Sequence, residues 1–444
     1  MSKIYAGILS TGTEILQGMY ADTNGQWLSE RLTEAGIVVR RIVAAPDRAE
    51  EVSDAIGWLV GQCDIVLMTG GLGPTEDDLT RQAVCRIFNR QLQEDSRAWK
   101  MIVHRFKTRG TKVPESNKVQ CMIPTGAEVL YNKWGTAPGF VIHDKPDDLD
   151  RTVFFAAMPG PPREMRPMFG EYLEKKLLAE FGSEAATRIR TLHTYGISES
   201  SINGMLRPLF EETREHPEVT LALLAGQARV DVRVTVRGQS REAMRKTIRR
   251  YSAKVRRRIP KGCIYGADDD TLEIVVNRLL RKYGKTLAVA ESCTGGLVAK
   301  RLTDIPGSSK ALLEGWVTYS NEAKQAHLGV RARTLEKFGA VSEETAREMA
   351  LGALKRSGAD IAVSTTGIAG PGGGSAKKPV GLVWYGIAWK EAEGADKAPD
   401  YGVATARTSF RSTRELVRIF ASHRALDLVR RHLLGLPFDL PISR

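Results

Sequence analysis

The sequence has few cysteines, no long apolar run and no internal repeat. Its 444 residues include five cysteines, an odd number with no Cys-x-x-Cys spacing. This argues against a disulfide framework and against a structural zinc site, and it predicts buried thiols. The five are Cys63, Cys85, Cys121, Cys263 and Cys293.

No apolar run approaches the roughly 20 residues of a membrane-spanning helix. Residues 1–5 lead into a predicted strand without a signal-peptide core. We therefore expect no membrane association and a cytoplasmic location. The composition, 42% hydrophobic and 26% charged, is that of a folded globular protein. A chain of this length exceeds what one core usually organises, so we expect two or three domains.

The net charge of +13 suits anionic partners, either nucleotides or nucleic acid. Much of this charge lies in residues 245–261, where Ile248, Tyr251 and Val255 interrupt the basic residues at helical spacing. No motif that reads nucleic acid accompanies the charge. The solvated face of a helix therefore explains the segment better than a nucleic-acid surface does.

The first 180 residues alternate predicted strands and helices. Strands are predicted at residues 4–9, 37–43 and 64–69, and helices at 24–35 and 48–63, from the spacing of their apolar residues. This order predicts a doubly wound α/β domain. In such domains the ligand sites lie beyond the carboxyl ends of the strands.

Two glycine-containing polar stretches, residues 10–18 and 69–78, follow two of these strands. In the second, Gly70, Gly71 and Gly73 free the backbone to cradle phosphate oxygens, and the helix that follows adds a favourable dipole. Asp77 and Asp78 could equally be charges at that helix N-terminus. Four carboxylates offer hard oxygen ligands for a divalent metal that bridges a pyrophosphate: Glu14, Asp22, Asp77 and Asp78.

Beyond a predicted amphipathic helix at residues 169–181, the pattern changes to a small α+β module. It contains no Gly-x-x-Gly loop between two helices, so a spacer or dimer-forming role is favoured over RNA binding. Glycines and acids at residues 262–270 predict a linker after it. The predicted strands are 188–195, 219–224 and 228–236, and the predicted helices are 198–209 and 241–258.

The last part of the chain is organised around residues 287–297, a predicted buried strand followed by a loop of small residues. Ser292, Cys293 and Thr294 occupy the loop, and Gly295 and Gly296 let a ligand approach the main chain. A serine here is placed to be a nucleophile, and it can equally be a helix cap. The loop is not the Gly-x-Ser-x-Gly elbow of α/β-hydrolases, so that mechanism cannot be inherited.

Serine is a weak nucleophile until a base takes its proton, and no histidine is placed for this by a recognisable pattern. Downstream, a lysine, Lys324, can serve if desolvation lowers its pKa, and Tyr319 can relay or donate a proton. Taken singly, Tyr319 could be a strand aromatic and Lys324 a surface charge. After another predicted strand, Thr366 and Gly367 could donate hydrogen bonds to a phosphate or a developing oxyanion.

These motifs resemble the CinA (competence/damage-inducible protein A) family over nearly the whole chain. In the first domain the resemblance rests on residues 69–78, which include Thr75, on residues 12–18, and on Gly135-Thr-Ala-Pro-Gly139. It implies a molybdopterin-binding-like domain that in some members hydrolyses ADP-ribose to AMP and ribose 5-phosphate. A divalent metal such as Mg²⁺, assisted by K⁺, would take part. The same fold binds molybdopterin elsewhere, so fold does not settle the substrate.

The C-terminal motifs, residues 290–296, 318–324 and 366–372, resemble the PncC-type nicotinamide-nucleotide amidase domain of this family. The resemblance implies an amidase without a cofactor. Arg414, the expected phosphate-binding arginine, follows Ser-Thr where the family has Gly-Asp. The implied roles are nucleophile for Ser292, its activators for Tyr319 and Lys324, and substrate binding for Thr366, Gly367 and Arg414.

We therefore expect an α/β protein with a molybdopterin-binding-like domain (residues 1–180), a KH-like α+β domain (181–266) and an amidase-type domain (267–444). The expected function is pyridine-nucleotide salvage by a homodimer. It would deamidate nicotinamide mononucleotide to nicotinate mononucleotide and hydrolyse ADP-ribose. The alternative is a non-catalytic nucleotide- or DNA-binding competence accessory protein that uses the basic segment, residues 245–261.

Overall fold

A computed structural model describes residues 4–146, 149–182, 186–238, 240–391 and 400–440. The chain divides into two units, residues 1–188 with 236–245, and residues 189–235 with 246–444. Within the described ranges, no helix has both the length and the apolar character that a membrane span requires. All five cysteines are buried and free, as predicted.

A six-stranded sheet, in the order β2-β1-β3-β8-β7-β6, organises the first unit. Its central strands are buried along their whole length, as parallel strands covered on both faces must be. The strands β1 (Tyr5–Thr11), β2 (Val38–Ala45), β3 (Ile65–Thr69) and β8 (Val153–Met158) are parallel. Beyond them, β7 (Gly139–Asp144) pairs antiparallel with β8, and β6 (Glu128–Leu130) pairs antiparallel with β7.

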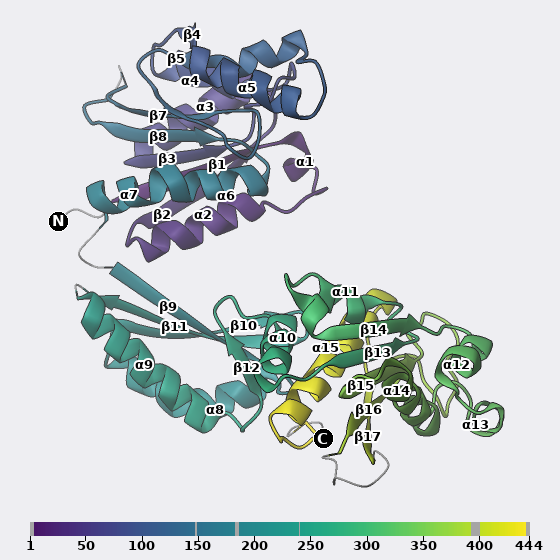
Figure 1. Ribbon diagram of the computed structural model, residues 1–444. Coiled ribbons are helices and arrows are strands. Elements are labelled where there is room, and N and C mark those ends of the chain that lie inside the picture. The colour runs from purple at the N-terminus through teal and green to yellow at the C-terminus, as the bar shows by residue number, and fades with distance from the viewer. Residues whose placement is uncertain (1–3, 147–148, 183–185, 239, 392–399, 441–444) are drawn as a thin grey trace. The chain divides into compact units, whose positions relative to one another are not determined.

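Helices cover both faces of this sheet (Figure 1). One face packs against α3 (Ala49–Gln62) and α4 (Thr80–Ile87). The other packs against α2 (Thr23–Glu34), α6 (Pro162–Met168) and α7 (Glu174–Glu180). The doubly wound prediction is confirmed. The single helix predicted at residues 169–181 is instead a π-helical turn, Phe169–Leu173, followed by α7. The remaining elements of this unit are α1 (Thr13–Leu16), β4 (Leu92–Glu94), α5 (Ser96–Thr108), the 3-10 turn Glu115–Cys121 and β5 (Met122–Pro124).

The middle module has the predicted order of strand, helix, two strands and helix, and its sheet order is β10-β11-β9-β12. The linker predicted at residues 262–270 is wrong, because a fourth strand lies there and pairs antiparallel with β9. Tyr265 in this strand and Cys263 just before it are buried, so local glycines did not prevent strand pairing. The elements are β9 (Ala186–Thr194), α8 (Glu199–Arg214), β10 (Val219–Gly226), β11 (Arg229–Gly238), α9 (Arg241–Arg258) and β12 (Ile264–Ala267).

The basic segment lies mainly on α9. Ile248, Tyr251 and Val255 are buried, whereas Arg249 and Arg257 are exposed. The spacing therefore separates an apolar, packed face from a charged, solvated one, as an amphipathic helix requires. This confirms the helix and its two faces.

The C-terminal module has a five-stranded sheet in the order β14-β13-β15-β16-β17. The strands β14, β13 and β15 are parallel, so their carboxyl ends meet at one edge. Beyond them, β16 pairs antiparallel with β15, and β17 pairs antiparallel with β16. Strands are β13 (Leu287–Glu291), β14 (Leu312–Val317), β15 (Ile361–Gly367), β16 (Leu382–Lys390) and β17 (Tyr401–Ser409).

One face of this sheet packs against α10 (Leu272–Tyr283), α11 (Leu297–Thr303) and α15 (Arg414–Leu433). The opposite face packs against α12 (Asn321–Leu328), α13 (Ala332–Phe338) and α14 (Glu343–Ser357). With both faces covered by helices, the module is again a layered α/β structure, as predicted.

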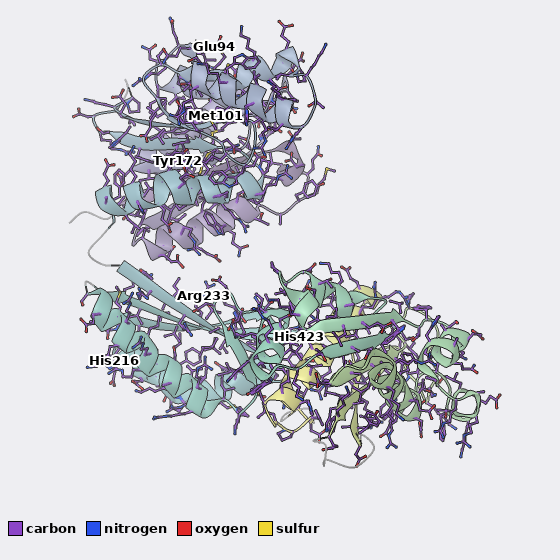
Figure 2. The ribbon with its side chains drawn as sticks, viewed as in Figure 1. Glu94, Met101, Tyr172, His216, Arg233 and His423 are labelled. Atoms are coloured by element: carbon purple, nitrogen blue, oxygen red, sulfur yellow. The ribbon has the colours of Figure 1, made fainter. Side chains whose placement is uncertain are left out.

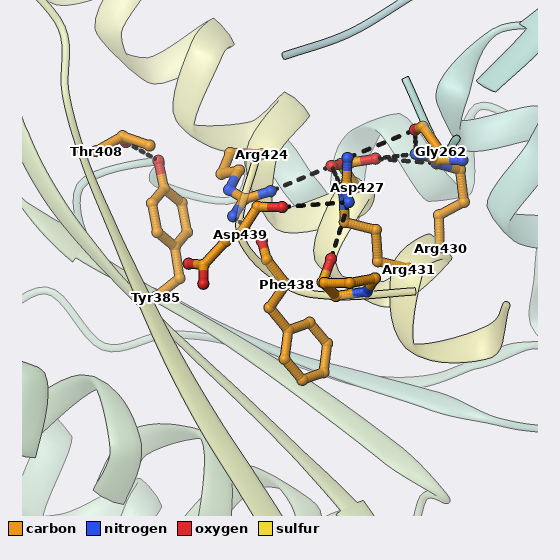
Figure 3. A network of polar contacts seen from close by, with 10 residues as sticks. Gly262, Tyr385, Thr408, Arg424, Asp427, Arg430, Arg431, Phe438 and Asp439 are labelled. Carbon is orange, nitrogen blue, oxygen red and sulfur yellow. Dashed lines mark hydrogen bonds and ion pairs between the residues drawn. The ribbon is translucent and has the colours of Figure 1, made fainter. Parts of the chain in front are cut away.

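A buried ion cluster joins α15 to the segment before β12. The carboxylate of Asp427, which is fully buried, accepts hydrogen bonds from Arg424, Arg430 and Arg431 (Figure 3). Arg430 also donates to the carbonyl oxygen of Gly262 at 2.6 Å. Removing Asp427 would leave the buried arginines without a carboxylate partner, which costs about 3–5 kcal/mol. The cluster therefore holds the middle module and the last helix together within the second unit.

Candidate functional site

The loop after β13 is shaped by a buried carboxylate that the sequence analysis did not select. Glu291 accepts hydrogen bonds from the backbone N–H of Val298 at 3.1 Å and of Ala299 at 2.8 Å, in the first turn of α11. These N–H groups at the helix start are therefore satisfied by Glu291 and are not free to bind a ligand. A lone acid closing an apolar strand was the signal that could have identified Glu291.

Ser292 lies against a buried amine. The Nζ atom of Lys324 donates to Ser292 Oγ at 3.1 Å, and to the carbonyl oxygens of Thr318 at 2.8 Å and Tyr319 at 3.1 Å. Lys324 is 1% exposed. No carboxylate in the described ranges forms an ion pair with it, and burial lowers the pKa of the Lys324 ammonium to about 8. The structure thus brings together the serine and the lysine that the sequence analysis paired as nucleophile and base.

Tyr319 lies elsewhere, on the surface beside Arg414. Its side chain is 62% exposed, and its hydroxyl accepts a hydrogen bond from Arg414 Nη2 at 3.1 Å. Arg414 Nη1 donates to the carbonyl oxygen of Gly370 at 2.8 Å. Within the described part of the chain the Tyr319 hydroxyl makes no hydrogen bond with Ser292 or Lys324. Its implied role as an activator therefore stays a prediction.

Other selected side chains are used inside the fold. The Thr366 hydroxyl donates to the carbonyl oxygen of Ala340 at 2.7 Å, and the Thr294 hydroxyl is 2.7 Å from that of Thr365. Both threonines are buried. Each hydrogen bond joins a loop to β15, which contains Thr365 and Thr366, so a bound ligand would have to compete with these contacts.

Cys293 and the two glycines complete the loop. Burial raises the pKa of the Cys293 thiol to about 12, so it stays protonated and cannot compete with Ser292 as a nucleophile. Gly295 and Gly296 have φ values of 59° and 90°, which side-chain-bearing residues rarely adopt. Gly367, at the end of β15, is partly buried, and a Cβ there would lie 2.7 Å from the carbonyl oxygen of Leu382. Glycine is therefore required at these turns by the backbone.

A second candidate site is a cleft of about 740 Å³ in the first unit, beyond the ends of β1 and β3. We call it the acidic cleft, because six carboxylate side chains line it and none of its described lining residues is a lysine, arginine or histidine. Asp47 and Glu164 are the two that the sequence analysis missed. The residues it did select all lie here: Glu14, Asp22, Gly70, Gly71, Gly73, Thr75, Asp77 and Asp78.

Asp78 organises the glycine loop of this cleft. One of its oxygens accepts from the N–H of Gly73 at 2.6 Å, and the other from the N–H of Thr75 at 2.9 Å and its hydroxyl at 2.5 Å. Asp22 caps α2 in a similar way, accepting from the N–H of Gly25 and from Ser10 Oγ, both at 2.8 Å. These two predicted metal ligands therefore hold the loops in place.

The described residues contain no group of three or more His, Cys, Asp or Glu side chains that converge on one metal position. The chemistry of the donors nevertheless suits a hard cation. Glu14 and Asp77 make no side-chain hydrogen bonds to other described residues, so they are the carboxylates most available to one. The predicted divalent metal and K⁺ stay predictions.

Comparison with known proteins identifies the family. A protein named "Putative competence-damage inducible protein" from Symbiobacterium thermophilum is 42% identical over 431 residues, which cover 97% of this chain and 99% of that protein. The chain belongs to the CinA family. A protein of the same name from Caldicellulosiruptor saccharolyticus is 40% identical over 430 residues, covering 97% of this chain and 99% of the relative.

Family models match the chain in three segments. They are the "Probable molybdopterin binding domain" at residues 7–179, the "Damage-inducible protein CinA KH domain" at 189–266 and the "CinA C-terminal domain" at 269–433. The crystal structure of a competence/damage inducible protein from Agrobacterium tumefaciens is 42% identical where it aligns. It covers 37% of this chain and 95% of that one, with a TM-score of 0.33. The resemblance to the CinA family and the predicted fold class are confirmed.

Proposed function

We propose that the C-terminal module of this CinA-family protein is a serine amidase that converts nicotinamide mononucleotide to nicotinate mononucleotide. The observation that carries the proposal is the 3.1 Å contact between Lys324 Nζ and Ser292 Oγ. A desolvated lysine whose pKa is about 8 exists partly as the neutral amine at neutral pH. Such an amine can take a proton from a serine hydroxyl and return it to a leaving group.

In the proposed reaction Ser292 Oγ attacks the carboxamide carbon while Lys324 takes its proton. The ammonium of Lys324 then gives this proton to the departing nitrogen. The carbon–nitrogen bond breaks, ammonia leaves, and the acyl group remains on Ser292 as an ester. Water attacks this ester, with Lys324 again as the base, and the proton returns to Ser292 Oγ as nicotinate mononucleotide is released.

Arg414 is the proposed partner of the substrate phosphate. It lies at the start of α15, where its guanidinium is held by the Tyr319 hydroxyl and the Gly370 carbonyl oxygen. Arginine held by two acceptors is pre-organised to bind a phosphate through its remaining N–H groups. On this interpretation Tyr319 positions Arg414, in addition to any part it has in activating Ser292.

The test is ammonia release from nicotinamide mononucleotide by the purified full chain and by Ser292→Ala. We expect the variant to lose at least about 10³-fold in rate, because the nucleophile is absent. Ser409→Ala, a serine on β17 outside the site, is the matched control and should retain the wild-type rate. Equal rates for Ser292→Ala and the wild-type protein would refute the proposal.

We further propose that the first unit hydrolyses ADP-ribose to AMP and ribose 5-phosphate. The glycine loop held by Asp78 in a cleft of about 740 Å³ supports this, because the glycines let a ligand approach the main chain and the volume suits a pyrophosphate-bearing nucleotide. A divalent cation at Glu14 and Asp77 would neutralise the pyrophosphate oxygens. The test is AMP formation by the full chain and by Asp77→Asn, and an unchanged rate in the variant would contradict the site assignment.

A non-catalytic nucleotide- or DNA-binding role is the competing proposal, and the exposed arginines of α9 support it. It predicts duplex DNA binding that weakens steeply with salt, with no turnover of either nucleotide. Incubating the protein with a panel of pyridine nucleotides and identifying the products therefore separates the two proposals directly.

A further inference from the structure

The first unit holds another cavity, of about 360 Å³, whose lining has the opposite charge to that of the acidic cleft. We call it the basic cavity. It lies between α5, on which Met101 is labelled in Figure 2, and the loop of residues 132–135. No acidic residue is among its described lining residues. The charged or titratable ones are Arg97, Lys100, His104, Arg105 and Lys133.

The spacing along α5 puts these side chains on one face. Arg97, Lys100 and His104 recur at intervals of three and four residues, the separation of neighbours on a helix surface. The helix Ser96–Thr108 contains no aspartate or glutamate. Like charges at this spacing repel each other by a few tenths of a kcal/mol per pair. An anion bound beside this face would turn that repulsion into attraction.

Two of the cations are used to hold the wall of the basic cavity. Arg105 donates to the carbonyl oxygen of Lys133 at 3.2 Å and to that of Trp134. The ammonium of Lys133 pairs with Glu171. The Nε atom of Arg105 is buried and has no hydrogen-bond partner among the described residues. A buried donor without an acceptor is costly, so a group that supplies an acceptor would be favoured there.

The other basic side chains are available to a ligand. Lys100 and His104 are exposed, and neither forms a hydrogen bond or an ion pair with another residue in the described ranges. The guanidinium of Arg97 lies over the ring of Tyr131, 4.2 Å from its centroid, which orients it without neutralising its charge.

The basic cavity and the acidic cleft share a wall. Asn132, which lines the basic cavity, donates to the Glu164 carboxylate of the acidic cleft at 2.8 Å. Its side-chain oxygen accepts from the N–H of Gly135 at 2.6 Å, and a Cβ at Gly135 would lie 1.6 Å from Glu164 Oε2. The loop of residues 132–135 therefore packs tightly between the basic cavity and the acidic cleft. Thr136, the next residue, lines the acidic cleft.

We propose that the basic cavity binds the phosphate group of a small phosphorylated ligand, with Arg97, Lys100 and His104 as its donors. The oxygens of one phosphate group can accept several charge-assisted hydrogen bonds at once, which suits several basic side chains on one helix face. The site is separate from the acidic cleft and from Ser292, and it does not depend on either proposed activity. The ligand could be inorganic phosphate or pyrophosphate, or the phosphate of a nucleotide.

Titration calorimetry on the full chain, in EDTA and at low salt, tests this with inorganic phosphate, pyrophosphate and AMP as probes. Without divalent cations, the carboxylates of the acidic cleft repel these anions. The variant Arg414→Gln, titrated alongside, removes the proposed phosphate partner of the Ser292 site, so the heat that it shares with the wild-type protein reports the basic cavity. We expect one pyrophosphate per chain, and the double variant Lys100→Gln/His104→Gln should weaken its Kd at least tenfold. Lys175→Gln, which removes an exposed charge from α7, should leave the Kd unchanged. Tighter binding of AMP than of pyrophosphate would identify a nucleotide as the ligand.

Three outcomes would overturn the proposal. One is equal affinity of the double variant and the wild-type protein, with both shown to be folded by circular dichroism. Another is loss of pyrophosphate binding in Asp77→Asn, which would place the ligand in the acidic cleft. The third is binding of a short oligonucleotide but of none of the three probes, which would make the basic cavity part of a nucleic-acid surface.

Discussion

The acidic cleft and the Ser292 site both follow the ends of parallel strands, yet their electrostatics are opposite. Six carboxylates and no basic side chain line the acidic cleft among its described residues. At the other site the amine of Lys324 contacts Ser292, and Arg418 donates to the carbonyl oxygen of Thr294 at 2.9 Å. The one buried acid there, Glu291, is satisfied by backbone N–H groups.

This difference teaches that the same architecture serves two chemistries through the side chains on its loops. A buried amine without a counter-ion has a lowered pKa and can work as a base by itself. A cleft of carboxylates attracts cations, and it can hold an anionic substrate only if a cation intervenes. The predictions below separate the two sites on these grounds.

Removing divalent cations should have the largest effect, and only on the acidic cleft. We expect EDTA to abolish AMP formation from ADP-ribose and to leave ammonia release from nicotinamide mononucleotide unchanged. Both products are measured in one sample, and Mg²⁺ added in excess should restore AMP. If EDTA stopped both reactions, the contrast drawn between the sites would be wrong.

Lys324→Met should lower the rate of ammonia release by about 10³-fold, because general bases contribute factors of this order. ADP-ribose hydrolysis should be unaffected, since Lys324 belongs to the second unit. Initial rates of both reactions check this. Lys310→Met, which removes an exposed lysine from the same module, should match the wild-type protein. Full amidase activity in Lys324→Met would end its assignment as the base.

Asp78→Asn should raise the KM for ADP-ribose by about 10- to 100-fold, the equivalent of one charged hydrogen bond. In the variant, one carboxylate oxygen is replaced by an N–H₂ group. The loop donors that bond to that oxygen in the wild-type protein would then face another donor and lose their acceptor. Steady-state kinetics with Asp54→Asn, an exposed aspartate on α3, as the control measure this. A change in kcat alone would indicate that Asp78 touches the reacting groups instead of holding the glycine loop.

The smallest effect expected is a pH dependence confined to the Ser292 site. The base must be neutral, and burial lowers the pKa of the Lys324 ammonium to about 8. The rate of ammonia release should therefore rise by about tenfold from pH 7 to pH 9 and then level off. A kcat/KM profile checks this. A rate that falls across this range would mean that the protonated amine is the active form.

Much of the fold was predictable because helix and strand periodicity is local. The apolar spacing in residues 241–258 predicted α9, and the bounded run before Ser292 predicted β13. The linker prediction failed because β12 is stabilised by pairing with β9, some 70 residues away, which glycine content cannot reveal. The hydrogen bonds that Asp22 and Asp78 accept from loop N–H groups could not be predicted for a similar reason, since these partners are set by backbone geometry.

The sequence by itself determined the alternation of strands and helices, the two glycine runs and the presence of a serine, a lysine and an arginine in separate motifs. Tertiary structure alone decided which of them meet. Lys324 reaches Ser292 across 32 residues because β14 lies beside β13, and Arg414 reaches Tyr319 across 95 because α15 returns to the same edge of the sheet. Burial then lowers the pKa of the lysine, a property that depends on every residue packed around it.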